Sequence, residues 1–462
     1  MKEKQKTGYI RRNKKNNQGK IILISIFLLI IIIGGGSFLF IQLNGLLNGN
    51  QSDKGKQTAQ QKKEESTNAP TEKPIDYAAI VMEADRIASG YDYDQAIKMI
   101  KAVDNYDETE ELVTAINKYK SEKKKLVKWE DNSKISHIFF HTLIADTSKA
   151  FDGDEKQDGY NQVMTTIDEF NKIMQQMYER GYVLVSIHDI AKMEKQKDGK
   201  EKMVQGEIWL PKGKKPFVLS QDDVSYYTYM EGDGFASKLV IGDDGKVTNE
   251  MIKDDGTVVR GSYDVLPLLE DFVAEHPDFS YRGAKGILAL TGYNGVLGYR
   301  TCPSDEATTD IKTATAEAKK VAKAIKAQGW EFASHSWGHR GMGSQKLSMF
   351  KKQADQWEEE VEPILGETDI LIYPFGEDIG DWRAYSGEKY EYLKKCGFNY
   401  FCNVDGSTPY WVQFNDGYLR QGRMNVDGIR MYEDLQGKDR LSVFFDVKSV
   451  FDKSRPLPVP SM

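Results

Sequence analysis

Cysteine is nearly absent from this chain, whose 462 residues include only Cys302, Cys396 and Cys402. An odd count this low excludes a disulfide-built scaffold and a zinc site made of cysteine pairs. Cys396 and Cys402 could form a disulfide if the chain turns back between them; otherwise all three are buried or idle thiols. The ordinary hydrophobic content, 40%, is enough for a sizeable core without such bridges.

An excess of positive charge is also missing. The chain has 63 lysines and arginines against 70 aspartates and glutamates, a formal net charge of −7. This balance gives no basic face for nucleic acid, so that class of partner is excluded. Histidine is scarce as well, with six in the chain, yet His335 and His339 stand four residues apart in the stretch 330–340.

One long apolar run stands close to the N-terminus. Residues 1–20 are rich in lysine and arginine, and residues 21–41 contain no charge. A helix of that length spans the hydrocarbon core of a bilayer. The flanking basic residues predict a cytoplasmic tail at 1–20, a single-pass anchor at 21–42 and an extracytoplasmic remainder at the cell membrane. A cleaved signal peptide is the alternative.

Two segments separate the predicted anchor from the main domain. Residues 43–75 are polar, with hardly a large apolar side chain after Leu47, which predicts a flexible linker. Residues 76–131 repeat apolar positions with a helical period and resemble a tetratricopeptide-like hairpin. A hairpin with so few repeats is not stable on its own. We therefore expect a helical spacer that packs on the neighbouring part of the chain. A binding role for the spacer is the alternative.

Residues 132–436 alternate short buried strands with amphipathic helices, which predicts a parallel α/β domain. Residues 437–462 are predicted to be a C-terminal tail. Within the domain, 231–260 is rich in glycine and aspartate and indicates an inserted loop or hairpin. The expected strands are 136–144, 182–187, 217–220, 286–290, 330–333, 370–373 and 400–403, and the expected helices are 163–181, 189–193, 265–275, 313–328, 347–365 and 390–396.

Polar residues follow several of these strands. Asp222 and Asp223 come after 217–220, and the two histidines come after 330–333. In an α/β barrel the carboxyl ends of the strands surround one site. Imidazole is the commonest metal-binding side chain, and four-residue spacing on a helical turn would point both rings the same way. A metal site is therefore one hypothesis, and polar residues on a solvated loop are the other.

Taken in order, the motifs resemble the polysaccharide deacetylase family, the NodB-like metal-dependent carbohydrate esterases. They read Leu-Ser-Gln-Asp-Asp-Val at 219–224, His-Ser-Trp-Gly-His at 335–339 and Ile-Tyr-Pro-Phe-Gly at 372–376. The strand Phe-Phe-His-Thr-Leu at 139–143 is similar to the family's first strand. The resemblance covers roughly 135–430 and implies an irregular (β/α) barrel of the NodB-like type.

The resemblance implies that Asp223, His335 and His339 hold a divalent metal ion. Zinc is the first expectation, and cobalt, nickel and manganese are alternatives. Asp222 would be the general base that takes a proton from the attacking water. Three residues, Tyr373, Pro374 and Phe375, would border the substrate and its oxyanion, through a backbone N–H near Phe375. Arg423 would orient the catalytic aspartate, unless it is a surface arginine.

The sequence departs from the family pattern in three places. Gln221 and Val224 replace a phenylalanine and a glycine beside the aspartates, so the local turn is expected to differ. The family's late Leu-x-His, whose histidine is the general acid, has no match, since no histidine follows His339. Leu-Arg-Gln stands in that region, at 419–421. His141 could substitute as the acid, and His137 is a second candidate; a core histidine is the alternative reading of both.

The implied function is that of a membrane-anchored, extracytoplasmic hydrolase of non-peptide carbon–nitrogen bonds. It would remove N-acetyl groups from a cell-wall or extracellular amino-sugar polysaccharide. The alternatives are an O-deacetylase, or a degenerate member that binds glycan or scaffolds the envelope without turnover. The aromatic stretches at 226–229 and 408–411 are either sugar-stacking platforms or core packing.

Overall fold

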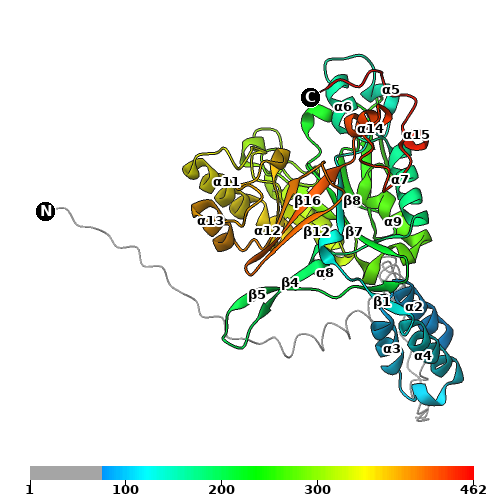
Figure 1. Ribbon diagram of the computed structural model, residues 1–462. Helices are drawn as coiled ribbons and strands as arrows, with labels where there is room; N and C mark the ends of the chain where they lie inside the picture. The colour runs from blue at the N-terminus through cyan, green and yellow to red at the C-terminus, as the bar shows by residue number, and fades with distance from the viewer. Residues whose placement is uncertain (1–74, 462) are drawn as a thin grey trace, which may run out of the picture. The chain divides into compact units, whose positions relative to one another are not determined.

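The structure is a computed structural model that describes residues 75–461 (Figure 1). The predicted cytoplasmic tail at 1–20, the anchor at 21–42 and nearly all of the linker at 43–75 lie outside the described residues. Among residues 75–461, no helix is both long enough and apolar enough to cross a membrane.

The first described elements are three helices, found where the apolar period predicts them. They are α2 (Tyr77–Ser89), α3 (Tyr93–Lys101) and α4 (Glu110–Lys123). They share a small apolar core. The Tyr91 hydroxyl donates to the carbonyl of Asp278, and the Arg282 N–H donates to the carbonyl of Gly90. The helices are therefore attached to the main domain by hydrogen bonds, in addition to the chain connection.

A closed ring of seven parallel strands forms the centre of the main domain. The ring closes because β7 pairs with β2 along its length and with β11 at its carboxyl end. This arrangement confirms the predicted (β/α) barrel. In ring order the strands are β2 (Ser136–Phe140), β7 (Lys215–Gln221), β11 (Ile287–Leu290), β12 (Glu331–Ser334), β13 (Ile370–Ile372), β14 (Tyr400–Val404) and β16 (Tyr418–Asn425). A further short strand, β3 (Tyr182–Leu184), pairs with the first residues of β7.

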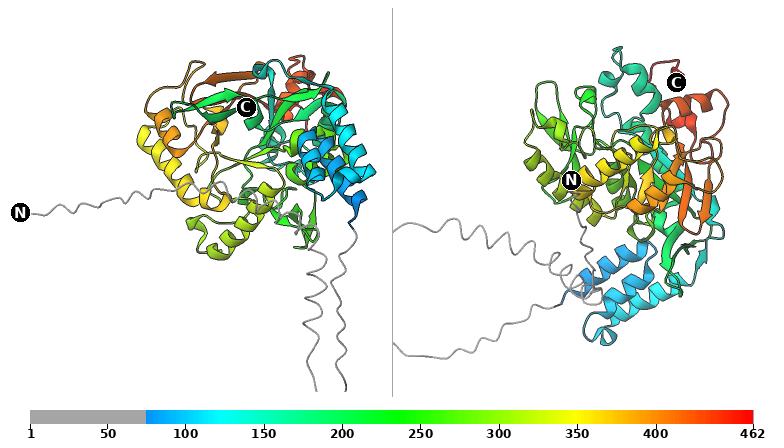
Figure 2. Two further views of the ribbon diagram at one scale, coloured as in Figure 1. Left: turned by 90° about the horizontal axis from the view of Figure 1, so that it is seen from below. Right: turned by 90° about the vertical axis from the view of Figure 1, so that its left-hand side faces the viewer.

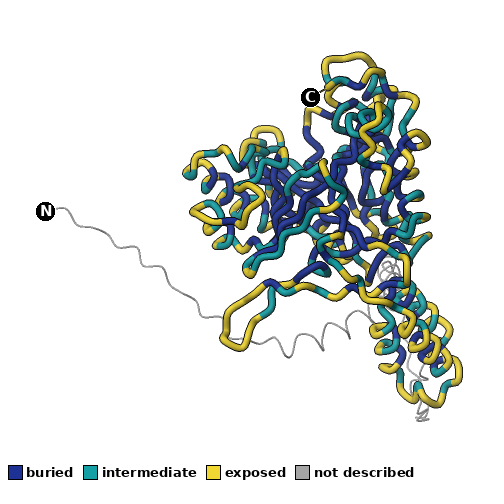
Figure 3. The backbone as a smooth tube through the Cα atoms, in the orientation of Figure 1, coloured by how far each residue is buried: buried dark blue, intermediate teal, exposed yellow. Residues whose placement is uncertain are grey.

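Helices surround the strands, as the two views of Figure 2 show. The buried residues follow the barrel strands, and the exposed ones lie on the outer helix faces and loops (Figure 3). Thr166 and Glu169 form a reciprocal capping box that begins α7, and Gly397 ends α13 in the left-handed conformation. The helices are α5 (Thr147–Ala150), α6 (Gln157–Val163), α7 (Ile167–Glu179), α9 (Val265–Glu275), α10 (Ile311–Ala327), α11 (Leu347–Glu360), α12 (Glu362–Leu365), α13 (Glu388–Cys396) and α14 (Gly428–Leu435).

The helix expected at 189–193 is wrong. Helix α8 (Ile187–Ile190) is a single turn, and the chain then extends as β4 (Ala191–Lys195), which pairs with β5 (Glu201–Gln205). Ala191 is buried and Met193 packs against the same apolar cluster, with Lys192 exposed between them. This alternation is the two-residue period of a strand, which a run of five residues does not separate clearly from a helical one.

The insertion expected at 231–260 is more regular than a loop or a hairpin. It contains an antiparallel sheet of three strands, β8 (Lys238–Ile241), β9 (Val247–Ile252) and β10 (Val258–Gly261). Gly245 and Gly256 have positive φ in the two connecting turns. Three other pairs of strands are antiparallel: β4 with β5, β1 (Leu126–Lys128) with β6 (Trp209–Pro211), and β15 (Trp411–Asn415) with β16.

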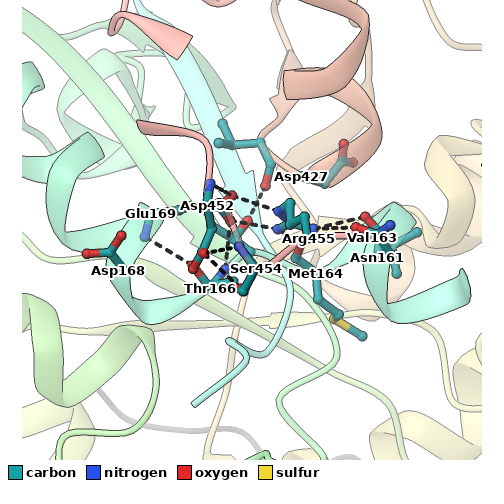
Figure 4. A network of polar contacts seen from close by, with 12 residues as sticks. Asn161, Val163, Met164, Thr166, Asp168, Glu169, Asp427, Asp452, Ser454 and Arg455 are labelled. Atoms are coloured by element: carbon teal, nitrogen blue, oxygen red, sulfur yellow. Dashed lines mark hydrogen bonds and ion pairs between the residues drawn. The ribbon is translucent and has the colours of Figure 1, made fainter. Parts of the chain in front are cut away.

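The predicted C-terminal tail is part of the compact domain. Phe444, Phe445 and Val450 are buried in the main core, the last of them on α15 (Val447–Val450). Arg455 forms an ion pair with Glu169 of α7, and both side chains are fully buried. Figure 4 shows this arginine between Glu169 and the backbone near Asn161. The segment from 437 onward therefore closes one side of the barrel domain.

The cysteines do not form a disulfide. Cys396 ends α13, Cys402 lies within β14, and both are free thiols, as is Cys302.

Candidate functional site

Two neighbouring aspartates follow the carboxyl end of β7, and neighbouring strands hold the backbone there. The Asp222 N–H donates to the carbonyl of Phe140 in β2, at 2.9 Å, and the Val224 N–H donates to the carbonyl of Ala289 in β11, at 3.2 Å. Asp223 has a positive φ of 61°. The left-handed residue is therefore Asp223 itself, which explains why Val224 can replace the glycine of the family pattern.

The histidine pair follows the carboxyl end of β12. His335 donates its Nδ1–H to the carbonyl of Ile372 in β13, at 2.8 Å, which leaves Nε2 with its lone pair directed elsewhere. The expected helical turn is wrong, because Ser336 and His339 have φ values of 57° and 47°. The loop nevertheless brings the two imidazole rings together, with their centroids 5.0 Å apart.

Asp223, His335 and His339 converge on one point. Each offers one ligand atom, and these atoms lie within 4.8 Å of one another; nowhere else in residues 75–461 does such a group occur. His339 Nε2 is 3.5 Å from Asp223 Oδ2, and His335 Nε2 is 4.0 Å from Asp223 Oδ1. Burial lowers the pKa of His335 and so favours its neutral form, which is the form that can bind a cation. Two imidazoles and a carboxylate with these spacings fit a divalent ion such as zinc.

Asp222 borders this cluster and is held by Arg423 of β16. The guanidinium binds both carboxylate oxygens, with Nη1 at 2.7 Å from Oδ1 and Nη2 at 2.9 Å from Oδ2. Burial favours a raised pKa for Asp222, but the Arg423 guanidinium outweighs this effect and holds the pKa of Asp222 below its usual range. Arg423 is fully buried, so the surface-arginine alternative is excluded.

The backbone is strained around the cluster. Ten non-glycine residues of the described chain have positive φ, and five of them surround these side chains: Asp223, Tyr226, Ser336, His339 and Phe375. Such conformations cost free energy and persist where the surrounding structure imposes them. Their concentration here is typical of a functional site.

The three predicted substrate residues lie in different environments. The ring of Tyr373 is buried and stacks on Phe401, and Pro374 is buried in the barrel wall. Phe375 is 73% exposed, and its ring meets the edge of His339 at a centroid distance of 4.5 Å. Of the three side chains, Phe375 is therefore the one that borders the mouth of the cluster.

The two candidate general acids, His137 and His141, also lie in different environments. His137 lies inside the barrel, with Nε2 2.9 Å from Ser220 Oγ and Nδ1 3.1 Å from Gln421 Oε1, which makes it a core histidine. Gln421, in the region of the family's late histidine, is itself buried. His141 follows β2 and donates its Nδ1–H to the carbonyl of Val163, at 3.1 Å. The strand before it, β2, pairs with β7, which ends directly before Asp222.

Tyr227 is a site residue that sequence reasoning missed. Its hydroxyl donates to Asp223 Oδ1, at 2.5 Å, and is 3.0 Å from the hydroxyl of Thr291. Its position four residues after Asp223 was the available signal. Tyr226 belongs to the core instead, where its hydroxyl donates to Asp264. Trp411, in the second aromatic stretch, has its ring against the Arg420 guanidinium, at 5.0 Å.

The structure is thus a parallel α/β barrel with two imidazoles and a carboxylate at the carboxyl ends of its strands, a set of side chains that could hold a metal ion. The family model described as polysaccharide deacetylase matches residues 306–401, which include His335, His339 and Phe375. This match supports the polysaccharide deacetylase family that the order of the motifs predicted. This family comprises hydrolases of amide or ester bonds in polysaccharides.

Two solved structures are similar to the chain. The Streptococcus pyogenes deacetylase PplD, in complex with acetate, has 12% identity and a TM-score of 0.34, and the match covers 66% of this chain and 94% of that one. The Bacillus anthracis protein BA0330 has 12% identity and a TM-score of 0.34, with 65% of each chain covered. No curated protein sequence matches the chain.

Proposed function

We propose that the protein is a metal-dependent hydrolase that removes N-acetyl groups from an amino-sugar polysaccharide. The observation that carries the proposal is the Asp222–Arg423 pair beside the cluster of Asp223, His335 and His339. Asp222 Oδ2 is 4.0 Å from His335 Nε2, so a carboxylate that is not needed as a ligand stands next to the ligand atoms. That is the place where a general base reaches an attacking water.

Each residue has a chemical role in this proposal. Asp223, His335 and His339 hold a divalent ion, which supplies a Lewis acid for the acetyl carbonyl and for the attacking water. Asp222 accepts the water proton, and Arg423 fixes the direction of its two oxygens. The backbone N–H of Phe375 is assigned to the oxyanion that develops on the acetyl oxygen.

The leaving amine needs a proton, and we assign its delivery to His141. The bond from Nδ1 to the Val163 carbonyl fixes the ring and leaves Nε2 as the nitrogen that can carry the transferred proton. This histidine follows β2, which pairs with β7 directly beside Asp222. Acid and base would thus come from adjacent strands.

The proposed location is the outer face of a cell membrane. The charge-free run at 21–41 and the basic residues before it support an anchor, and the polar stretch at 43–75 supports a tether. A cell-wall or extracellular amino-sugar polymer is the substrate within reach of an enzyme held there.

The test is acetate release from N-acetylglucosamine oligomers by the full chain, with a divalent metal added. The wild type and Asp416→Ala, a change in an exposed carboxylate, are expected to release acetate, and Asp223→Ala is expected to lose nearly all activity. Undiminished release by Asp223→Ala would contradict the proposal. Release from an O-acetylated oligomer with little release from the N-acetylated one would assign the site to ester rather than amide substrates.

A second candidate function rests on Gln421. This amide lies in the region of the family's late general acid, and its two ends bond to His137 and to the carbonyl of Ile135. It cannot supply a proton to a leaving amine. A protein that binds acetylated glycan without turnover is the corresponding alternative, and binding of the oligomer with no acetate release by the wild type would favour it.

A further inference from the structure

Three tyrosine rings form a stack beside the cluster. The rings of Tyr227 and Tyr293 have centroids 5.1 Å apart and planes at 21°, and those of Tyr227 and Tyr229 have centroids 5.7 Å apart and planes at 15°. Tyr227 is the shared ring, and its hydroxyl binds the predicted metal ligand Asp223. The middle ring of the stack is therefore the one that contacts the cluster, and Tyr229 is an outer ring that stacks on it.

The outer ring is held in place but is not covered. The Thr228 N–H donates to Asn294 Oδ1, at 2.9 Å, and Lys156 Nζ donates to the carbonyl of Tyr229, at 2.7 Å. Both bonds fix the backbone on either side of the ring. Tyr229 is nevertheless 51% exposed, whereas Tyr227 is buried. An ordered aromatic ring with one side stacked and half of its surface in solvent is a platform prepared for a flat apolar partner.

We propose that Tyr229 binds a pyranose ring of the polymer next to the unit that is deacetylated. The C–H bonds on one face of a pyranose form an apolar surface, which matches an aromatic face in size and shape. This inference rests on the proposed function, because the occupant is a sugar of the same chain whose acetyl group lies at the Asp223 cluster. The inference adds that the substrate is a segment of a polymer, because a single amino sugar at the Asp223 cluster would leave the Tyr229 ring without a partner.

The experiment compares full-chain variants on N-acetylglucosamine oligomers of one to five units, with zinc added. Wild type is expected to show kcat/KM rising with length, and Tyr229→Ala is expected to lower the ratio of kcat/KM for the pentamer to that for the monomer by about tenfold, mainly through KM. Tyr229→Phe keeps the ring and is expected to keep the ratio. Trp209→Ala removes another half-exposed aromatic residue, on β6, and is the matched control.

The outcomes separate this inference from the proposed function. Equal losses by Tyr229→Ala on monomer and pentamer, or no loss on either, would overturn the platform. If the wild type releases no acetate, the proposed function fails, and calorimetric titration with the pentamer decides the platform alone. Weaker binding by Tyr229→Ala than by Tyr229→Phe would then support it, and equal binding would overturn it.

Discussion

Arg423 holds both carboxylate oxygens of Asp222, at 2.7 and 2.9 Å, although 201 residues separate the two in the chain. Both side chains are buried, and the guanidinium also covers the ring of Phe139, at 4.0 Å. The pair joins β16 to the end of β7 across β2. It gives Asp222 one fixed direction and keeps it ionised, which are the two properties that a general base in this position needs.

Replacing Arg423 tests this pair. Arg423→Met is expected to leave a buried carboxylate without its partner, to lower the free energy of unfolding by about 3 kcal/mol, and to slow acetate release by about a hundredfold. Urea denaturation and an acetate assay measure the two effects. Arg260→Met, which removes a half-exposed arginine from surface ion pairs, is the control and is expected to change stability by less than about 0.5 kcal/mol. Equal effects of the two substitutions would contradict the assignment.

Tyr227→Phe tests the hydrogen bond to Asp223. The phenol fixes one oxygen of a predicted metal ligand, so its removal is expected to weaken zinc binding by about tenfold. Competition with a chromophoric chelator measures the affinity. Tyr229→Phe removes a hydroxyl one ring away and is expected to leave the affinity unchanged. A wild-type affinity in Tyr227→Phe would show that the bond does not support the ligand.

Removing the ion pair of Arg455 and Glu169 tests how the C-terminal segment is attached to the domain. Both side chains are fully buried, and the guanidinium also donates to the carbonyls of Asn161 and Met164. Arg455→Met is expected to lower the free energy of unfolding by about 3 kcal/mol and to increase amide exchange after residue 437. Lys438→Met, at a half-exposed pair in the same segment, is the control. Unchanged exchange in Arg455→Met would show that apolar contacts alone hold the segment.

His188 predicts a pH dependence of stability. Its Nδ1 contacts Glu331, and its Nε2 is 3.0 Å from Asp369 Oδ1. Burial lowers the pKa of His188, but the hydrogen bonds to Asp369 and Glu331 outweigh it and raise the pKa to about 10. A folded-state pKa above the unfolded value, about 6.5, stabilises the fold fully below about pH 6.5 and loses this effect as the pH rises toward 10.

The His188→Gln variant measures that effect. The difference in Tm between wild type and variant is expected to be largest at pH 6 and to shrink steadily up to pH 10. Thermal unfolding at unit steps of pH gives the profile. A difference that stays constant, or that grows with pH, would contradict the charged bridge between the start of β12 and the residue before β13.

The sequence was sufficient for the barrel and for the cluster because both depend on local patterns. Short apolar runs mark the strands, and the polar residues directly after them must meet at one edge when the strands are parallel. The two aspartates and the histidine pair were brought together in this way, whereas the choice of Asp223 as the third ligand came from the family resemblance. A local pattern does not determine the backbone conformation inside a loop. The four-residue spacing of the histidines indicated a helical turn, but Ser336 and His339 have positive φ, so the loop is irregular.

The sequence alone could not predict contacts that depend on how distant segments pair and pack in the fold. Nothing near Arg423 distinguishes an arginine that crosses the barrel from one on the surface, since only the pairing of β16 with β2 brings it to Asp222. The burial of Phe444 and Phe445 likewise follows from the packing of the last segment on the domain.

In the proposed function, Asp223, His335 and His339 hold the metal ion on which deacetylation depends. The most direct measurement is acetate release against bound zinc, determined on the same samples of chelated protein during a titration. We expect no release without metal, a linear rise in release with bound zinc, and a plateau at one bound ion per chain, with neither binding nor release in His339→Ala. Full release by the metal-free protein, or a plateau unaffected by His339→Ala, would contradict it.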